Sequence, residues 1–401
     1  MKTQIEQIKV KNFRLYKNLH ITNLQRLNVF LGANGSGKTT LFKVFSFLAT
    51  CLKENVTVAI NREGGFKEVI TRNSDPEKDF IEFEIKFRNF EQDEKSPLVT
   101  YYLKIGFNKG KVFIEREILK YRRGRKGRPW HFLDYSKGVG SAIKNEQDYD
   151  IEPWKFEEKR EELPLEAEDI LALKGLGQFE RYSIIKSFRI LLEQWSVSNL
   201  QNEEMRKIND AGADSQLSMS GNNLGQVASY LYEYQRNIFN TILDKMQQRV
   251  PGVNKVDVSI NEAGQIFLKF KDNNFINPFI SKYTSDGTIK MFAYLVLLHD
   301  PTPRPLLSIE EPENYLYPTL LRELAEELRD YAQRGGQVFV STHSPDFVDA
   351  LNIKELFLVK KEHGISDISP AKNDDDIVEM CENGCELGWL WQHDYFKGIN
   401  P

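Results

Sequence analysis

Residues 32–39, Gly-Ala-Asn-Gly-Ser-Gly-Lys-Thr, constrain the fold of this chain more than any other part of its sequence. They fit the pattern G-x-x-x-x-G-K-[ST], in which glycines let backbone N–H groups turn toward phosphate oxygens. Apolar residues from Leu27 to Leu31 predict a strand before this segment, and a helix is expected over about residues 38–52. A strand, a glycine-rich loop and a helix in this order predict a phosphate-binding loop in an α/β fold.

Each position of this loop has an expected task in holding a nucleoside triphosphate. Lys38 carries the charge that reaches the β- and γ-phosphates, and the hydroxyl of Thr39 is a ligand for Mg²⁺. The motif therefore predicts ATP and Mg²⁺ as cofactors. The residues that we expect to contact the nucleotide are Gly32, Asn34, Gly35, Ser36, Gly37, Lys38, Thr39 and Thr40.

Two adjacent carboxylates, Glu310 and Glu311, end an apolar segment that begins at Pro305. This is the Walker B pattern with an additional glutamate. We expect Glu310 to hold Mg²⁺ through water and Glu311 to accept a proton from the attacking water. Paired acids at a strand end also occur in solvated turns, and the presence of Lys38 favours the catalytic interpretation.

Residues 284–288, Thr-Ser-Asp-Gly-Thr, open a mostly apolar helix and are similar to the signature sequence of ABC proteins. Ser285 can cap this helix, and Gly287 lets its N-terminus approach an anion, which the helix dipole favours. In an ABC-type fold this face lies far from its own phosphate loop, so we expect it to serve the γ-phosphate that a partner chain holds. A simple helix cap is the alternative interpretation.

A further apolar segment, residues 335–342, ends at His343. It follows the paired carboxylates by one helix and one strand. A histidine at a strand end is more often structural than catalytic when it is seen alone. Its place in this series of motifs favours a switch that senses the γ-phosphate.

The rest of the sequence changes pattern along the chain. Alternating apolar residues from Ile81 to Phe107 predict an antiparallel sheet, because the gaps between strands are short. Residues 157–250 have helical periodicity, including a long amphipathic helix from Leu224 to Met246. After residue 250, alternation of helix and strand implies a parallel sheet flanked by helices. We predict an α/β fold with an N-terminal ATPase lobe at residues 1–156, a helical insertion at residues 157–250 and a C-terminal ATPase lobe at residues 251–401.

In this order the motifs GANGSGKT, TSDGT, SIEEPEN and STHSP resemble those of the RecF/SMC-like branch of ABC ATPases. The chain is most similar to the small stand-alone ATPases of the AAA15/AAA21 group, which are related to the ATPase half of OLD-family nucleases and are often found in bacterial anti-phage systems. The resemblance extends from KNFRLYKN at residues 11–18 through REGGFKEVITR at residues 62–72 to STHSPDFVDAL at residues 341–351. It implies a P-loop ATPase head with an antiparallel β-subdomain, a helical insertion and no long coiled coil.

The resemblance also assigns places to individual residues. Phe13 and Arg14 should lie beside the nucleotide, with Arg14 near its phosphates. Asn314 should lie at the seam of an ATP-dependent homodimer. The candidates for the glutamine of a Q-loop are Gln147 and Gln178.

One departure from the family pattern concerns the metal. Glu310 stands where aspartate is usual, so its contact with Mg²⁺ is expected to be longer or mediated by water. The catalytic residues that the motifs assign are Lys38, Glu311 and His343, and Arg14, Ser285 and Gly287 join the phosphate loop as nucleotide-binding residues.

Three classes of function are compatible with these motifs. The first is a dimeric ATPase switch that controls a nucleic-acid or nuclease partner encoded nearby, with a RecF-like role in DNA repair as the alternative. The second is a self-sufficient nuclease, which needs an acidic metal cluster of toprim type that the sequence after His343 lacks. The third is a transporter subunit, but the interval from Lys38 to Glu310 is much longer than in those proteins. We therefore favour the first class.

Composition limits where the chain acts and what it binds. The formal net charge is −4 over 401 residues, so any contact with DNA or RNA must be local. Residues 120–131, which hold six basic side chains beside Tyr121 and Trp130, are the candidate segment, and a solvated hairpin turn is the alternative. Because no apolar run approaches a membrane span, the start lacks a secretion signal and only three cysteines occur, we expect a cytoplasmic protein without membrane contact. The aromatic tail at residues 386–396 either packs on the ATPase lobe or anchors a partner.

Overall fold

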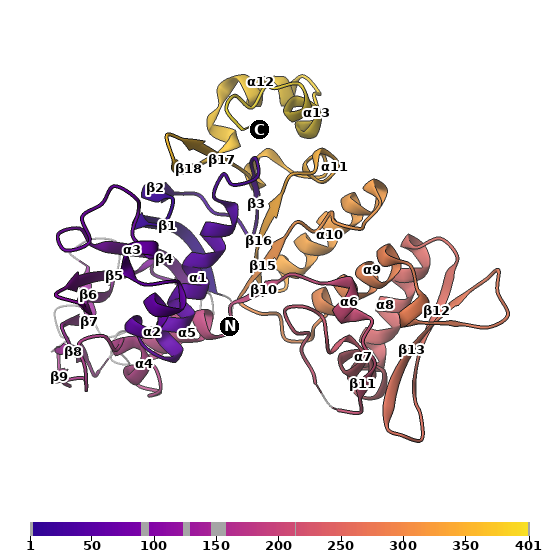
Figure 1. Cartoon of the computed structure of the whole chain (residues 1–401), viewed down its shortest axis with the longest axis horizontal. Helices are drawn as coiled ribbons and strands as arrows, with labels where there is room; N and C mark the ends of the chain where they lie inside the picture. The colour runs from indigo at the N-terminus through magenta and orange to yellow at the C-terminus, as the bar shows by residue number, and fades with distance from the viewer. Residues whose placement is uncertain (1–2, 90–95, 123–128, 146–157, 213, 400–401) are drawn as a thin grey trace.

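The computed structural model describes residues 3–89, 96–122, 129–145, 158–212 and 214–399. Two lobes lie side by side with a sheet between them, and helices α12 (Asp375–Glu382) and α13 (Leu387–Gln392) lie above that sheet in the view of Figure 1. None of the helices within the described ranges combines the length and the apolar character that crossing a membrane requires.

A six-stranded sheet forms the centre of the molecule. Its strands run in the order β10-β15-β16-β3-β17-β18, and all neighbours are parallel except β17 and β18. The parallel sheet that we predicted is therefore confirmed. Its strands are β3 (Leu27–Leu31), β10 (Ser196–Ser198), β15 (Leu306–Glu310), β16 (Gln337–Thr342), β17 (Leu356–Glu362) and β18 (Ile365–Pro370).

Alternation along these strands divides the apolar interior into two cores. In β3, Val29 and Leu31 belong to one core and Phe30 to the other. Helix α1 (Lys38–Lys53) packs in the core of Phe30, while α9 (Asp286–Leu298) packs in the core of Val29 and Leu31. Because successive side chains of a strand point to opposite faces of its sheet, α1 and α9 cover opposite faces.

The first lobe is built on an antiparallel sheet with the strand order β2-β1-β4-β5-β6-β7-β8-β9, as the alternating sequence pattern predicted. Its strands are β1 (Thr3–Phe13), β2 (Tyr16–Ile21), β4 (Ile81–Asn89), β5 (Val99–Asn108), β6 (Lys111–Tyr121), β7 (Trp130–Ser136), β8 (Val139–Ile143) and β9 (Arg160–Glu162). Besides α1, its helices are α2 (Val56–Arg62), α3 (Phe66–Val69), α4 (Ala172–Leu176) and α5 (Ser183–Glu193).

The second lobe packs helices against a small antiparallel sheet, at the right of Figure 1. Besides α9, its helices are α6 (Asn202–Met205), α7 (Leu224–Tyr234), α8 (Arg236–Arg249) and α10 (Pro318–Gln333). Its strands are β11 (Asn209–Asp210), β12 (Val253–Ile260), β13 (Gln265–Asp272) and β14 (Phe279–Ile280).

The single helix that we expected from Leu224 to Met246 is two helices. The chain breaks at Gln235, whose backbone has φ −132° and ψ 49°, between α7 and α8. Tyr234, which the pattern assigned to the buried stripe, is 66% exposed. Spacing of three and four residues continues across the break, so periodicity alone could not reveal it.

The residues expected to form one helical insertion, 157–250, contribute to both cores. Helix α5 packs in the core of Phe30, which is the core of the first lobe. Helices α7 and α8 pack in the core of Val29 and Leu31, which is the core of the second lobe. The division of the chain at residues 156 and 250 stays a prediction.

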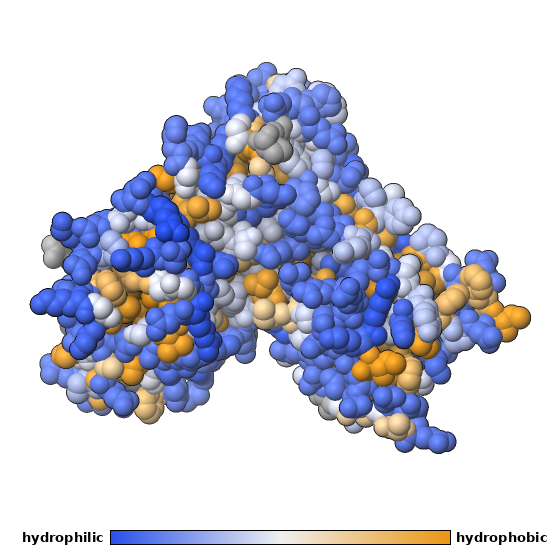
Figure 2. All heavy atoms as spheres, viewed as in Figure 1, coloured by the Kyte–Doolittle hydropathy of each residue, from blue (hydrophilic) through white to orange (hydrophobic). Residues whose placement is uncertain are grey.

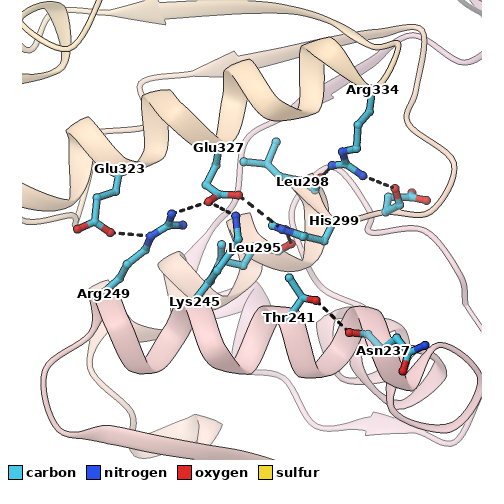
Figure 3. Close-up of polar contacts among 11 residues, drawn as sticks. Asn237, Thr241, Lys245, Arg249, Leu295, Leu298, His299, Glu323, Glu327 and Arg334 are labelled. Carbon is cyan, nitrogen blue, oxygen red and sulfur yellow. Dashed lines mark hydrogen bonds and ion pairs between the residues drawn. The ribbon is translucent and has the colours of Figure 1, made fainter.

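Three helices of the second lobe meet around one buried carboxylate (Figure 3). Glu327 of α10 is 2% exposed and forms ion pairs with Lys245 and Arg249 of α8, the latter at 2.5 Å. Nε2 of His299, at the C-terminal end of α9, lies 3.6 Å from the other carboxylate oxygen. The cluster therefore ties the far end of α9 to α8 and α10.

The two lobes differ in the apolar side chains that they expose. Within the described ranges most exposed large hydrophobic residues belong to the second lobe; they are Ile208, Met219, Tyr234, Ile260, Phe275, Ile276, Phe279, Tyr283, Tyr315 and Tyr317. The first lobe exposes Val139 and Phe179. Figure 2 shows apolar residues as separate patches on a largely hydrophilic face.

Part of the aromatic tail packs on the rest of the fold. Leu390, Trp391 and Phe396 are buried in the core of the second lobe. The carbonyl oxygen of Ile399 accepts a hydrogen bond from the backbone N–H of Ala33 at 3.1 Å. The end of the described chain therefore contacts the glycine-rich loop directly.

Candidate nucleotide site

The register of the central sheet brings three of the motifs to one edge. Leu31 of β3 lies opposite Thr342 of β16, and Glu310 of β15 lies opposite Ser341. Parallel strands end at the same edge of a sheet, so the phosphate loop, the paired carboxylates and His343 all begin there. The sequence motifs are thus neighbours in space although Gly32 and His343 lie 311 positions apart in the sequence.

Packing on both sides holds the phosphate loop in one conformation. Gly37 has φ 119°, which favours glycine, and a Cβ there would lie 2.7 Å from Oγ of Ser366. The hydroxyl of Tyr16 donates to the carbonyl oxygen of Gly37 at 2.8 Å, and Oγ of Ser366 donates to the carbonyl oxygen of Ser36 at 2.5 Å. The conformation of the loop is therefore held by residues of β2 and β18.

Lys38 is buried within this loop. Its Nζ donates to the carbonyl oxygens of Gly32 at 2.5 Å and Ala33 at 3.0 Å. Burial lowers its pKa, and the nearby charges of Glu311 and Glu313 oppose that shift. These carboxylates thus help to keep the lysine cationic, which is the form that binds phosphate.

The outer residues of the loop remain open to solvent. Asn34, Gly35 and Thr39 are exposed, whereas Ser36 and Thr40 are buried. Thr39 lies in the first turn of α1, where backbone N–H groups and the helix dipole favour an anion. An exposed hydroxyl beside a buried lysine suits a nucleotide and its metal.

The carboxylates end β15 in the order that the sequence predicted. Glu310 is the last residue of the strand, and Glu311 follows it in the left-handed region at φ 45°, a strained conformation that is found at functional sites. Nδ1 of His343 lies 3.3 Å from Oε1 of Glu311, and Nδ2 of Asn314 donates to its Oε2 at 3.2 Å. Glu311 is thus held from two sides while 35% of its side chain stays exposed.

A third carboxylate of this turn, Glu313, was not among the predicted site residues. Glu313 accepts hydrogen bonds through Oε1 from the Thr342 hydroxyl at 2.8 Å and from the backbone N–H of His343 at 2.9 Å. Burial raises its pKa, and these hydrogen bonds oppose the shift. The only sequence signal was a third acid shortly after the strand, and such residues are usually solvated.

The structure places the signature motif on the other side of the sheet. Oγ of Ser285 caps α9 by accepting from the backbone N–H of Thr288 at 3.2 Å. A Cβ at Gly287 would lie 3.0 Å from the carbonyl oxygen of Tyr315, so this end of α9 packs closely on the turn after the carboxylates. Because α9 and α1 cover opposite faces, Ser285 and Gly287 belong to the other side of the sheet from the helix that begins at Lys38.

Phe13 and Arg14, which we expected beside the nucleotide, lie in different surroundings. Phe13 is fully buried and packs on Phe47 and Phe83, with ring centroids 5.5 and 5.3 Å apart, so a nucleotide contact for it is wrong. The guanidinium of Arg14 forms an ion pair with Glu63, which also lies 3.5 Å from Nζ of Lys43 on α1. Arg14 is therefore already paired beside α1, and its phosphate contact stays a prediction.

The remaining candidates lie partly outside the described residues. Gln147 is outside them, and the side chain of Gln178 is exposed and donates to the carbonyl oxygen of Lys174 at 3.4 Å. Most of the basic segment, residues 123–128, is also outside. Tyr121 at its edge is buried and stacks on Phe132 at 3.9 Å, so base stacking by Tyr121 is wrong.

Known proteins match this chain over a domain and over a short segment. Residues 27–349 match the family model AAA_21, described as "AAA domain, putative AbiEii toxin, Type IV TA system". A segment of 46 residues is 44% identical to the "DNA replication and repair protein RecF" of Lactococcus lactis subsp. cremoris, strains MG1363 and SK11. That segment covers 12% of this chain and 13% of the relative's length.

Two solved structures share the fold. A "SmcHead bound to the C-winged helix domain of ScpA" aligns with a TM-score of 0.52 and 14% identity, over 91% of this chain and 97% of that one. An Smc head with an extended coiled coil from Pyrococcus furiosus, bound to the C-terminal domain of ScpA, aligns with a TM-score of 0.50 and 14% identity, over 95% of this chain and all of the other. The described residues thus have a head-like α/β fold without a coiled coil, as the sequence predicted.

Proposed function

The chain belongs to the AAA_21 family, within the RecF/SMC-like ABC ATPases, and on that premise we propose that it binds ATP with Mg²⁺, hydrolyses the ATP and dimerises around it. The observation that carries this proposal is the meeting of three groups at one sheet edge. These are the buried cation Lys38, the half-exposed carboxylate Glu311 and the imidazole of His343.

The residues at this edge fit ATP and Mg²⁺. The exposed hydroxyl of Thr39 and the carboxylate of Glu310 would hold the metal, which when bound neutralises charge on the phosphate oxygens. Within the described ranges no group of three or more His, Cys, Asp or Glu side chains could hold a metal. Phosphate oxygens and water would therefore complete its shell.

Each catalytic residue has one proposed task. Lys38 would exchange its two carbonyl partners for oxygens of the β- and γ-phosphates. Glu311 would accept the proton of the attacking water, since its side chain is accessible and held by Asn314. His343 would contact the γ-phosphate and report its presence to the turn that bears Glu311.

We propose that a second copy of the chain completes each site. Ser285 caps a helix on the opposite face of the sheet from α1, so its open N-terminus suits a phosphate that another chain holds. Apolar exposure supports an interface here, because Tyr283, Tyr315 and Tyr317 near this helix end are 70%, 65% and 77% exposed.

The proposed partner is an effector directed at nucleic acid, such as a nuclease encoded nearby, that acts in cytoplasmic anti-phage defence. The toxin in the description of the family model supports this choice. A RecF-like role in DNA repair, with direct contact to DNA or RNA, is the alternative, and the segment shared with RecF favours it. A nuclease gene beside this one would favour the first, and replication and repair genes would favour the second.

The test of hydrolysis is the substitution Glu311→Gln. It keeps the size of the side chain and removes the base, so ATP binding measured by calorimetry should persist while turnover falls by roughly 10²–10⁴. Glu326→Gln, on the exposed side of α10, is the matched control and should turn over normally. Near-normal turnover by Glu311→Gln would contradict the assignment of the base.

The test of the dimer uses crosslinking in Glu311→Gln chains whose partly exposed Cys381 and Cys385 are replaced by serine. One preparation carries Ser285→Cys and the other Asn34→Cys. Mixed with ATP and Mg²⁺, they should form a crosslinked pair of chains. A third preparation carries Ser285→Cys and Asn34→Cys in the same chain. If this chain crosslinks only within itself, the face-to-face arrangement is wrong.

A further inference from the structure

Glu313 is more buried than the other carboxylate that contacts His343. Its side chain is 9% exposed, compared with 35% for Glu311. Oε1 accepts from the Thr342 hydroxyl and from the backbone N–H of His343, so the carboxylate joins the turn after β15 to the end of β16. Oε2 is also buried and accepts no hydrogen bond from any residue of the described ranges.

Both carboxylates face the same nitrogen of the imidazole. Nδ1 of His343 lies 3.3 Å from Oε1 of Glu311 and 3.5 Å from Oε1 of Glu313. A ring nitrogen between two carboxylates acts as a donor, and the group that binds one nitrogen sets the role of the other. Nε2 is therefore the nitrogen that remains for a ligand.

The surroundings of Glu313 suit a fixed acceptor better than a base. Its side chain is buried away from water, whereas Glu311 is exposed enough to meet water. The charge of Glu313 acts to raise the pKa of Lys38 and of the buried Lys290 of α9. Neither lysine forms an ion pair with it within the described ranges. Among the described contacts, the partners of Glu313 are therefore Thr342 and His343.

We propose that Glu313 is a positioning residue for the ATPase proposed above, on which this inference rests: it holds His343 with Nδ1 toward the carboxylates and leaves Nε2 for the nucleotide. Glu313 acts through the hydrogen bonds of its Oε1 and does not touch the attacking water. Its effect on turnover therefore passes through His343.

A double-mutant cycle tests this path. Glu313→Ala and His343→Ala should each lower kcat by about 10²-fold, the loss typical of a misplaced catalytic group. ATP affinity measured by calorimetry should stay near that of the unmodified chain, because Lys38 is untouched. If Glu313 acts through His343, the double variant should be no slower than His343→Ala alone.

A conservative variant separates positioning from a general loss of structure. Glu313→Gln keeps an oxygen that can accept from Thr342 and His343, so kcat should stay within about fivefold of the unmodified chain. Thr342→Val removes one donor and should cost a similarly small factor, which keeps the test open if Glu313→Ala does not fold. Glu326→Ala is the exposed control.

Two results would overturn the proposal while leaving the ATPase function intact. One is a double variant whose fold-loss in kcat equals the product of the losses in the two single variants. The other is a Glu313→Gln variant with a kcat as low as that of Glu313→Ala. If the unmodified chain does not hydrolyse ATP at all, it is the proposed function that fails, and the two failures are thereby distinguished.

Discussion

The two lobes contribute different surroundings to the two halves of the proposed site. In the first lobe Lys38 is buried, and its loop is held by Tyr16 and Ser366 before a ligand arrives. In the second lobe the open end of α9 lies among exposed aromatic side chains such as Tyr283 and Tyr315. In the proposed dimer the first half would hold a small anion, while the second would meet the surface of the partner chain.

The lobes also bury their carboxylates in different ways. Glu117 of β6 is fully buried and accepts from the backbone N–H groups of Ala172 and Leu173 and from the hydroxyl of Tyr101. Glu327 in the second lobe is surrounded by the cations of α8 instead. Glu117 thus caps α4 by accepting from neutral donors, whereas Glu327 joins three helices through charged partners.

These environments shift the two pKa values in opposite directions. Burial raises the pKa of Glu117 to about 7, and its hydrogen bonds only partly oppose that shift. Burial also acts to raise the pKa of Glu327, but Lys245 and Arg249 outweigh it and lower the value. The first lobe should therefore gain stability as the pH falls from about 7, whereas the second should lose stability only in stronger acid, below the ordinary pKa of a glutamate.

The largest effects, on ATP affinity and on turnover, should come from disabling one half-site at a time. Lys38→Ala removes the charge that faces the phosphates, so ATP affinity measured by calorimetry should fall by about 100-fold or more. Ser285→Arg should leave binding to the phosphate loop nearly unchanged and abolish turnover, because it blocks the other half. Equal loss of binding in both variants would show that one lobe does not bind ATP by itself.

A mixture of these two variants sharpens the same comparison. A mixed dimer keeps one composite site with neither defect, so partial turnover should return on mixing. Lack of any recovery, with exchange of subunits demonstrated, would contradict the division of the site between two chains.

A smaller effect, on stability, is expected in the charged cluster of the second lobe. Glu327→Ala leaves Lys245 and Arg249 without their buried partner and should cost roughly 3–5 kcal/mol of unfolding free energy. Glu323→Ala is the matched control, since Glu323 pairs with the same Arg249 but is 39% exposed and should cost at most about 1 kcal/mol. Urea unfolding measures both, and equal losses would mean that burial does not decide the role of Glu327.

The smallest effect is the pH response of the first lobe. Because its folded pKa is raised, Glu117 contributes stability that is fully present below the unfolded pKa near 4.3 and is lost as the pH rises through about 7. The slope should be roughly 1 kcal/mol per pH unit in this window, and Glu117→Gln should remove it. Urea unfolding between pH 5 and 8 gives the measurement, and an unchanged slope in the variant would assign the response to another group.

Sequence by itself determined the local parts of this protein. The glycines and Lys38 of the loop, the acids at the end of β15 and the histidine after β16 each come at the end of an apolar strand, and the alternation of helix and strand after residue 250 predicted the parallel sheet. Alternating residues likewise predicted the antiparallel sheet. These signals are local because strand periodicity and loop chemistry depend on near neighbours in the chain.

Only the tertiary structure decided which of the candidate side chains are free to act. Phe13 and Tyr121 looked available in the sequence, but the first core buries both. Glu313 looked like one more surface acid, but Thr342 and the backbone of His343 hold it inside. Burial and pairing here depend on residues from other strands and helices, so a pattern of neighbouring residue types cannot contain them.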